Sequence, residues 1–239
     1  DPVAPRSFRG PFATLKDTCA ALNDCQKRAA AELSVAGPNY SCRSKKPVAT
    51  LPKPAAPYRA VQLIAAVCAE GKKDTGDSDS RVYLVVQGEK GWFATDVGGK
   101  IESEQLRTFT DFAVGELRLT AGPAPRLLLR VKESGGHDVG EGSDSWENEK
   151  LVIAGIGPSG TPSATPPLLI SSLETEDPGA AEATESAESA EASDQGAKPI
   201  VRVDAKLKFD LQGDVLELTP ASAAKAVARA RLAPVGKYT

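Results

Sequence analysis

The feature that most constrains this chain is a run of strand-like segments separated by connections rich in glycine and proline. The clearest segment is 201–211, where apolar residues alternate strictly with charged residues. A strict period of two indicates a strand with one packed face and one solvated face. The connections at 121–125, 134–146 and 157–167 show no helical periodicity, which parallel crossovers would need. The sequence therefore predicts an antiparallel, mainly-β fold.

The predicted architecture is an antiparallel sandwich or flattened barrel of about eight to ten strands. A disulfide-tied N-terminal helix and a short C-terminal helix are expected to cover it. The strand at 59–68 is apolar on both faces and should be central. The other strands are expected at 81–87, 92–97, 108–120, 126–133, 149–156, 167–173, 201–211 and 215–218.

Helical patterning is confined to the two flanks of this β region. Apolar residues from Leu15 to Leu33 form one helical stripe, which ends at Gly37-Pro38. A second helix is predicted to begin with Thr219 as N-cap and Pro220 at the first helical position, and to run to about Arg231. The expected organisation is an extended arm (1–11), a disulfide-bonded helical segment (12–42), a basic Pro-rich connector (43–57), a β domain (58–232) with an acidic disordered insertion (174–198), and a tail (233–239).

The charge distribution limits the classes of partner. The net charge is −3, and eight of the acids lie in 174–197 without a single Lys or Arg. Without those eight acids the net charge would be +5, which is too small to favour nucleic acid. The acidic segment either stays solvated or attracts a basic partner, including the basic body of the same chain. Aromatic residues make up only 5% of the chain, which argues against a carbohydrate platform or a base-stacking surface.

The first residue is Asp1 and the chain contains no Met. We interpret this as a mature exported protein whose signal peptide has been removed, located in the periplasm, at the cell surface or in the medium. No apolar run approaches the roughly 20 residues that a transmembrane helix needs, so no membrane span is expected.

The four cysteines carry the strongest chemical signal, because an even set is typical of an oxidising compartment. Cys19 and Cys25 would be about 9 Å apart in a regular helix, beyond disulfide reach. We therefore favour Cys25–Cys42 and Cys19–Cys68, with the swapped pairing open. A Cys19–Cys25 bridge would need the helix to break near residue 23. Zinc is not expected, because no CxxC spacing occurs.

Two acid-rich connections are weak candidates for calcium, which prefers carboxylate and hydroxyl oxygens. Neither matches the twelve-residue calcium loop, and Asp, Ser and Gly are also ordinary turn residues. No other cofactor is expected. The candidate ligands are Asp74, Asp77 and Asp79 in the first connection, and Asp138 and Asp144 in the second.

Three other features resemble functional sites. Residues 155–160 spell GxGxxG, but Pro158 and Pro162 forbid the helix that a dinucleotide site needs, so a hairpin loop is predicted. His137, the single histidine, is expected to be an exposed loop residue. Trp146 lies in a polar segment and either tucks against the sheet or anchors a partner.

These observations favour a non-catalytic, secreted or cell-envelope interaction or structural module. It would be a subunit or accessory of a larger extracytoplasmic assembly with protein partners. The alternatives are a secreted hydrolase that uses the acidic loop residues, and an inhibitor or small-ligand carrier.

The cysteine interpretation makes a direct prediction. Protein from its natural source would be alkylated first in its folded state and again after denaturation without reduction. Mass spectrometry should then find no alkylated cysteine, because disulfides persist in oxidising compartments. Four alkylated cysteines would contradict both the disulfides and the predicted location.

Overall fold

The computed structural model describes residues 6–22, 38–42, 47–70, 78–103, 108–122, 124–139, 142–177, 200–212 and 215–238. Within these residues the protein is mainly β, with fifteen strands and two helices. Every strand pair is antiparallel. The predicted antiparallel, mainly-β fold is therefore confirmed.

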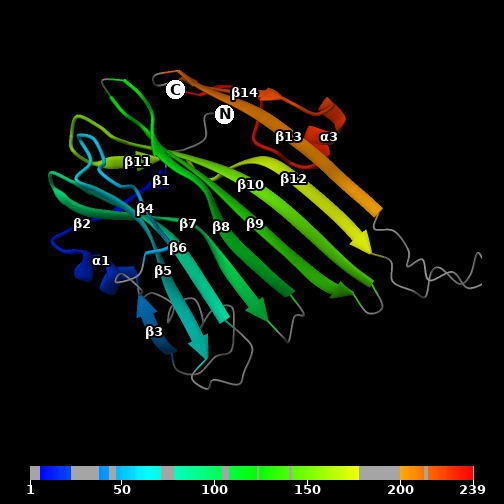
Figure 1. Cartoon of the computed structure of the whole chain (residues 1–239), viewed down its shortest axis with the longest axis horizontal. Helices are drawn as coiled ribbons and strands as arrows, with labels where there is room; N and C mark the ends of the chain where they lie inside the picture. Colours follow the sequence, from blue (N-terminus) through cyan, green and yellow to red (C-terminus); the bar gives the residue numbers. More distant parts are fainter. Residues whose placement is uncertain are drawn as a thin grey trace, which may run out of the picture.

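Eleven strands pair in one path, and most neighbours in this path are also neighbours in sequence. Figure 1 shows them side by side as a strongly curled sheet. This count exceeds the predicted eight to ten strands. The path runs through β3 (Pro38–Cys42), β5 (Ala60–Glu70), β6 (Ser78–Gly88), β7 (Gly91–Ser103), β8 (Thr108–Leu119), β9 (Leu127–Val139), β10 (Gly142–Ile156), β12 (Leu168–Asp177), β13 (Ile200–Gln212), β14 (Val215–Pro220) and β15 (Gly236–Tyr238).

The prediction of a loop at 134–146 is wrong, because these residues lie in a hairpin of two long strands. β9 continues to Val139 and β10 begins at Gly142, so that His137 pairs with Asp144. The glycines in this stretch resemble loop residues in sequence, but aromatic rings from neighbouring strands lie over them. A Cβ atom on Gly135 would lie 2.3 Å from the Trp146 ring, so the glycine makes room for the indole.

The inside of the curl is an apolar core to which opposite sides of the sheet contribute. Tyr58, just before β5, donates a hydrogen bond of 3.2 Å to the carbonyl oxygen of Ala154 on β10. Burial raises the pKa of Tyr58 to about 12, against a smaller lowering effect from Arg126. The core comprises Phe8, Tyr58, Val61, Leu63, Val82, Leu84, Val86, Phe93, Val97, Leu127, Leu129, Val131, Val152, Ala154 and Ala164.

The N-terminal segment bridges the curl at one end, which we call the bridged end. β1 (Arg6–Ser7) pairs with β11 (Pro162–Ala164), which itself pairs with β10, and β2 (Arg9–Phe12) pairs with β7. Phe8 lies between the two short strands and is buried in the core. In the described part of the predicted arm (1–11), these two strands belong to the sheet. Residues 1–5 lie outside the described residues.

Close backbone approach at this bridge depends on glycine. Gly10 has a φ of +130°, and a Cβ atom there would lie 2.6 Å from the carbonyl oxygen of Trp92. A side chain at this position would therefore meet both an unfavourable backbone conformation and a steric clash.

Helix α1 (Leu15–Leu22) covers the outer face of β5–β7. Cys19 and Leu22 are buried against Ile64, Tyr83 and Val85. The helix begins with a capping box, because the Asp17 N–H donates to the Thr14 hydroxyl and the Thr14 N–H donates to the Asp17 carboxylate. The predicted stripe is confirmed up to Leu22, and residues 23–37 lie outside the described residues. Part of the Pro-rich connector forms β4 (Ala49–Thr50), which pairs with β5.

The C-terminal region folds back over the outer face of β9, β10 and β12. β13 pairs with β12 over Ile200–Lys206 and with β14 over Leu207–Gln212, so it belongs to two sheets. A strand that switches sheets in this way makes a corner. A second apolar core lies beneath, formed by Leu128, Leu151, Leu168, Ile170, Val203, Ala205, Leu207, Leu216, Leu218, Ala230, Leu232 and Ala233.

The C-terminal helix, α3 (Ala224–Arg229), is shorter than predicted. Thr219 and Pro220 do not start it, because they extend β14 and pair with Lys208 and Leu207. Strand pairing with β13 therefore outweighs the preference of the Thr-Pro sequence for a helix start. Of the acidic insertion (174–198), residues 174–177 belong to β12, and residues 178–198 lie outside the described residues.

Replacing Phe8 with Ala tests the bridge. Because Phe8 is only 9% exposed, Phe8→Ala should lower the free energy of unfolding by about 3 kcal/mol in urea titration. Ser7→Ala, at the exposed neighbouring position, should change it by less than about 0.5 kcal/mol. Equal stability of the two variants would contradict the bridging role.

Candidate functional site: a cavity inside the curled sheet

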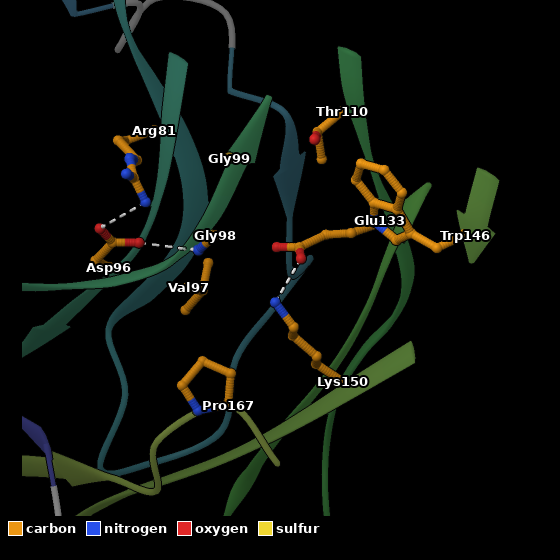
Figure 2. A pocket seen from close by; sticks show the side chains of 10 residues that line it. All are labelled: Arg81, Asp96, Val97, Gly98, Gly99, Thr110, Glu133, Trp146, Lys150 and Pro167. Carbon is orange, nitrogen blue, oxygen red and sulfur yellow. Dashed lines mark hydrogen bonds and ion pairs between the residues drawn. The ribbon is translucent and has the colours of Figure 1, made fainter. Parts of the chain in front are cut away.

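Toward the other end of the curl, which we call the distal end, the apolar core gives way to a cavity of about 340 Å³. At this end β5, β7, β9 and β12 finish and the next strands begin. The cavity receives side chains from β6 to β10 and from the segment before β12 (Figure 2). Its lining comprises Arg81, Asp96, Val97, Gly98, Gly99, Thr110, Glu133, Trp146, Lys150 and Pro167.

The cavity lies where β7 and β8 diverge. β7 pairs with β8 only over Ile101–Ser103, whereas its first residues pair with β2. Asp96–Gly99 therefore form one side of a fork in the sheet, and Thr110, which pairs with Ile101, lies where the two strands meet. An opening of this kind is not visible in the hydrophobic pattern, because it depends on which strand β7 pairs with along its length.

A β-bulge shapes the β7 side of the fork. Val82 pairs with Gly98 while the next residue, Tyr83, pairs with Asp96, so Val97 is the extra residue. The Gly98 N–H donates a 2.9 Å hydrogen bond to Asp96, whose carboxylate also lies 4.0 Å from the Arg81 guanidinium. Bulges commonly redirect side chains next to binding sites.

Glu133 spans the cavity from β9 toward β7. Its carboxylate accepts a hydrogen bond from the Lys150 ammonium group, and the two side chains are only 12% and 27% exposed (Figure 2). A Cβ atom on Gly98 would lie 2.5 Å from the other oxygen of Glu133. Gly98 also has a φ of +139°, so this position favours glycine for two separate reasons.

Trp146 borders the cavity from β10 and is half-buried. Its ring lies over Gly135, and the ring of His137 is 5.1 Å away at an interplanar angle of 38°. Of the two alternatives for Trp146, the structure shows that it tucks against the sheet; contact with a partner is untested. His137 is exposed, as predicted, but lies on a strand.

A second charged cluster lies on the opposite face of the same strands and has a structural role. Arg130 donates a hydrogen bond to the buried carboxylate of Glu149 and lies 3.6 Å from Glu116. The Arg130 guanidinium is 5.9 Å from the centre of the Phe209 ring on β13. These contacts satisfy the buried charge and help to hold β13 against the sheet.

The predicted calcium ligands are only partly described. Asp144 lies on β10, with its carboxylate 3.9 Å from Arg202, and Arg202 donates a 2.6 Å hydrogen bond to Glu176. That hydrogen bond raises the pKa of Arg202. Within the described ranges no three His, Cys, Asp or Glu side chains are grouped as a metal site. Asp74 and Asp77 lie outside the described residues, and only the backbones of Asp79 and Asp138 are described, so the five-residue set stays a prediction.

Sequence reasoning missed Glu133, Lys150, Arg81 and Asp96 as members of one site. The available signal was a charge at inward positions of two adjacent strands, since Glu133 follows Val131 and Lys150 precedes Val152 at a spacing of two. This signal identifies a site only when the register between β9 and β10 is known, in which Glu133 pairs with Asn148. The GxGxxG segment is a hairpin as predicted, closed by a 2.9 Å hydrogen bond from Gly160 to Gly157.

Comparisons with protein-family models, with curated proteins and with solved structures give no match. Neither α1 nor α3, the helices in the described part of the chain, has the length and hydrophobicity that crossing a bilayer requires.

The ion pair that crosses the cavity can be tested by a double-mutant cycle. Glu133→Gln and Lys150→Met should each lower the free energy of unfolding by about 1–3 kcal/mol, because each leaves a largely buried partner charge. The double variant should lose less than the sum, with a coupling energy of about 1 kcal/mol or more.

The exposed pair Lys237–Glu217, at 3.9 Å, provides the matched control. Its coupling energy should be within about 0.5 kcal/mol of zero. Additive effects at Glu133 and Lys150 would show that the two side chains do not interact in solution.

Proposed function

We propose that this protein is a non-catalytic binding module that acts outside the cytoplasm and binds a small ligand in the cavity inside the curl. The observation that carries the proposal is the cavity itself. It has the volume of a small-ligand site, and its lining combines the Trp146 ring, the apolar residues Val97 and Pro167, and five polar side chains. Among the alternatives from the sequence, this favours the small-ligand carrier.

The charges in the cavity support binding in preference to catalysis. Glu133 is paired with Lys150, and Asp96 lies 4.0 Å from Arg81. A general acid or a nucleophile must be able to exchange its proton or attack a substrate, whereas these carboxylates are engaged with cations and with the Gly98 backbone. The hydrolase alternative therefore has less support.

The location outside the cytoplasm rests on the cysteines. Among the described residues no cysteine is free. Cys19 is buried on α1, against the outer face of β5–β7. The backbones of Cys42 and Cys68 lie on the paired strands β3 and β5, where Cys42 is opposite Ala66. We retain Cys19–Cys68 and Cys25–Cys42 as the proposed pairs; the first would fasten α1 to the sheet.

A second candidate is the role of an assembly subunit with a protein partner. Phe109 and Val201 are 49% and 60% exposed. They occupy the ends of one row across five strands near the distal end, with Gly136, Ser145 and Thr175 between them. Directly paired residues share a face of the sheet, so this row forms a surface of small and apolar side chains.

Equilibrium dialysis against a small-molecule extract of the source organism tests the cavity. Wild-type protein should retain at least one compound that mass spectrometry detects after denaturation. Thr110→Phe places a ring in the cavity and should abolish the retention. Ala113→Phe adds the same ring at an exposed position on the other face of β8 and should preserve it. Retention of the same compounds by Thr110→Phe would place the site elsewhere.

A further inference from the structure

We propose that the cavity binds an uncharged, polyhydroxylated ligand of sugar size, with an apolar face of its ring against Trp146. This inference rests on the proposed function and specifies the ligand class. Its evidence is the charge balance of the cavity, the position of the indole ring, and an unsatisfied hydrogen-bond acceptor nearby.

The charge balance disfavours an ionic ligand. Each carboxylate in the lining has its own cation: Glu133 has Lys150, and Asp96 has Arg81. A singly charged ligand would add an unbalanced charge to pairs that are already neutral, in a largely buried place, which is costly. A hydroxyl group avoids this conflict, because it donates to a carboxylate and accepts from an ammonium group without separating them.

The ion pair retains hydrogen-bonding capacity for such a ligand. The Lys150 ammonium group has three N–H donors, of which the contact with Glu133 uses one. The Glu133 carboxylate can accept several hydrogen bonds, and Thr110 contributes a hydroxyl group that both donates and accepts. Hydroxyl groups of one ring can therefore hydrogen-bond to Glu133 and Lys150 without separating them.

Trp146 supplies a fixed apolar surface. Because its ring lies on Gly135 and beside His137, the indole has few alternative positions. A ring face carries partial negative charge and attracts the polarised C–H groups of a sugar ring. One indole is enough for one sugar ring, so the low aromatic content of the chain does not conflict with this site.

An unsatisfied acceptor lies beside the site on β10. Asn148 stands between Trp146 and Lys150 at a spacing of two, on the same face of the strand, and pairs with Glu133. Its side-chain oxygen is buried and has no hydrogen-bond donor among the described residues. A hydroxyl donor that reaches this oxygen would satisfy a group that is otherwise destabilising.

The volume sets the size of the ligand. A cavity of about 340 Å³ lies near the lower end of the range of small-ligand sites, and one sugar ring is a suitable size for its ligand.

The test compares sugars that share a ring and differ in charge. Calorimetry would be run with glucose, galactose, mannose and N-acetylglucosamine, and with glucuronate and glucosamine as charged analogues. At least one neutral sugar should bind more tightly than its charged analogues. Its affinity should also change less than about twofold between about 0.05 and about 0.5 M salt, because no ionic attraction is involved.

Two tryptophan variants separate stacking from general stability. Trp146→Ala should weaken binding of that sugar by about tenfold or more, whereas Trp146→Phe should recover part of the affinity. Trp92→Phe, which changes the ring that packs near α1 on the other face of the sheet, should leave the affinity unchanged. Equal affinity of wild type and Trp146→Ala would overturn the stacking contact.

The outcomes distinguish this inference from the proposed function. If dialysis yields a charged or wholly apolar compound that Thr110→Phe excludes, the cavity is a ligand site but the ligand class is wrong. Tighter binding of glucuronate or glucosamine than of the neutral sugars would overturn the class in the same way. If dialysis yields no compound and no sugar binds, both proposals fail.

Discussion

The structure depends on closing a curled antiparallel sheet with backbone hydrogen bonds from a short N-terminal segment. β1 continues the sheet from β11, β2 continues it from β7, and Phe8 between them fills the core. Without this bridge, the edges at one end of the curl would present unpaired backbone groups, and the apolar interior would open to water. Gly10 allows the close approach that the bridge requires.

The same closure explains why the distal end differs from the bridged end. β7 has β2 as a partner near its start and β8 only near its finish, so the two strands separate in between. The bulge at Val97 and the small residues Gly98 and Gly99 occupy this fork and leave space that larger side chains would fill. The cavity is thus a consequence of how the sheet closes, and Glu133 with Lys150 makes its interior polar.

Two separate parts of the chain cover the outer face of the sheet. α1 packs on β5–β7, and the corner in β13 folds the C-terminal strands and α3 over β9, β10 and β12. The buried Arg130–Glu149 pair lies between these strands and β13, so polar groups are present on both faces of β9 and β10. The inner group borders the cavity, which is why the proposed function is placed there.

The sequence alone determined the local pattern, because residue spacing is a property of the chain itself. The alternation at 201–211, the reversal at 88–91 and the stripe from Leu15 to Leu22 all predicted elements that the structure contains. What only the tertiary structure decided is which of these elements meet. Gly135 looked like a loop residue because the indole that covers it comes from another strand, and Thr219 looked like a helix cap because its partner Lys208 could not be foreseen. Glu133 lies on β9 and Lys150 and Trp146 lie on β10, and the register of this hairpin sets which of their residues lie side by side at the cavity.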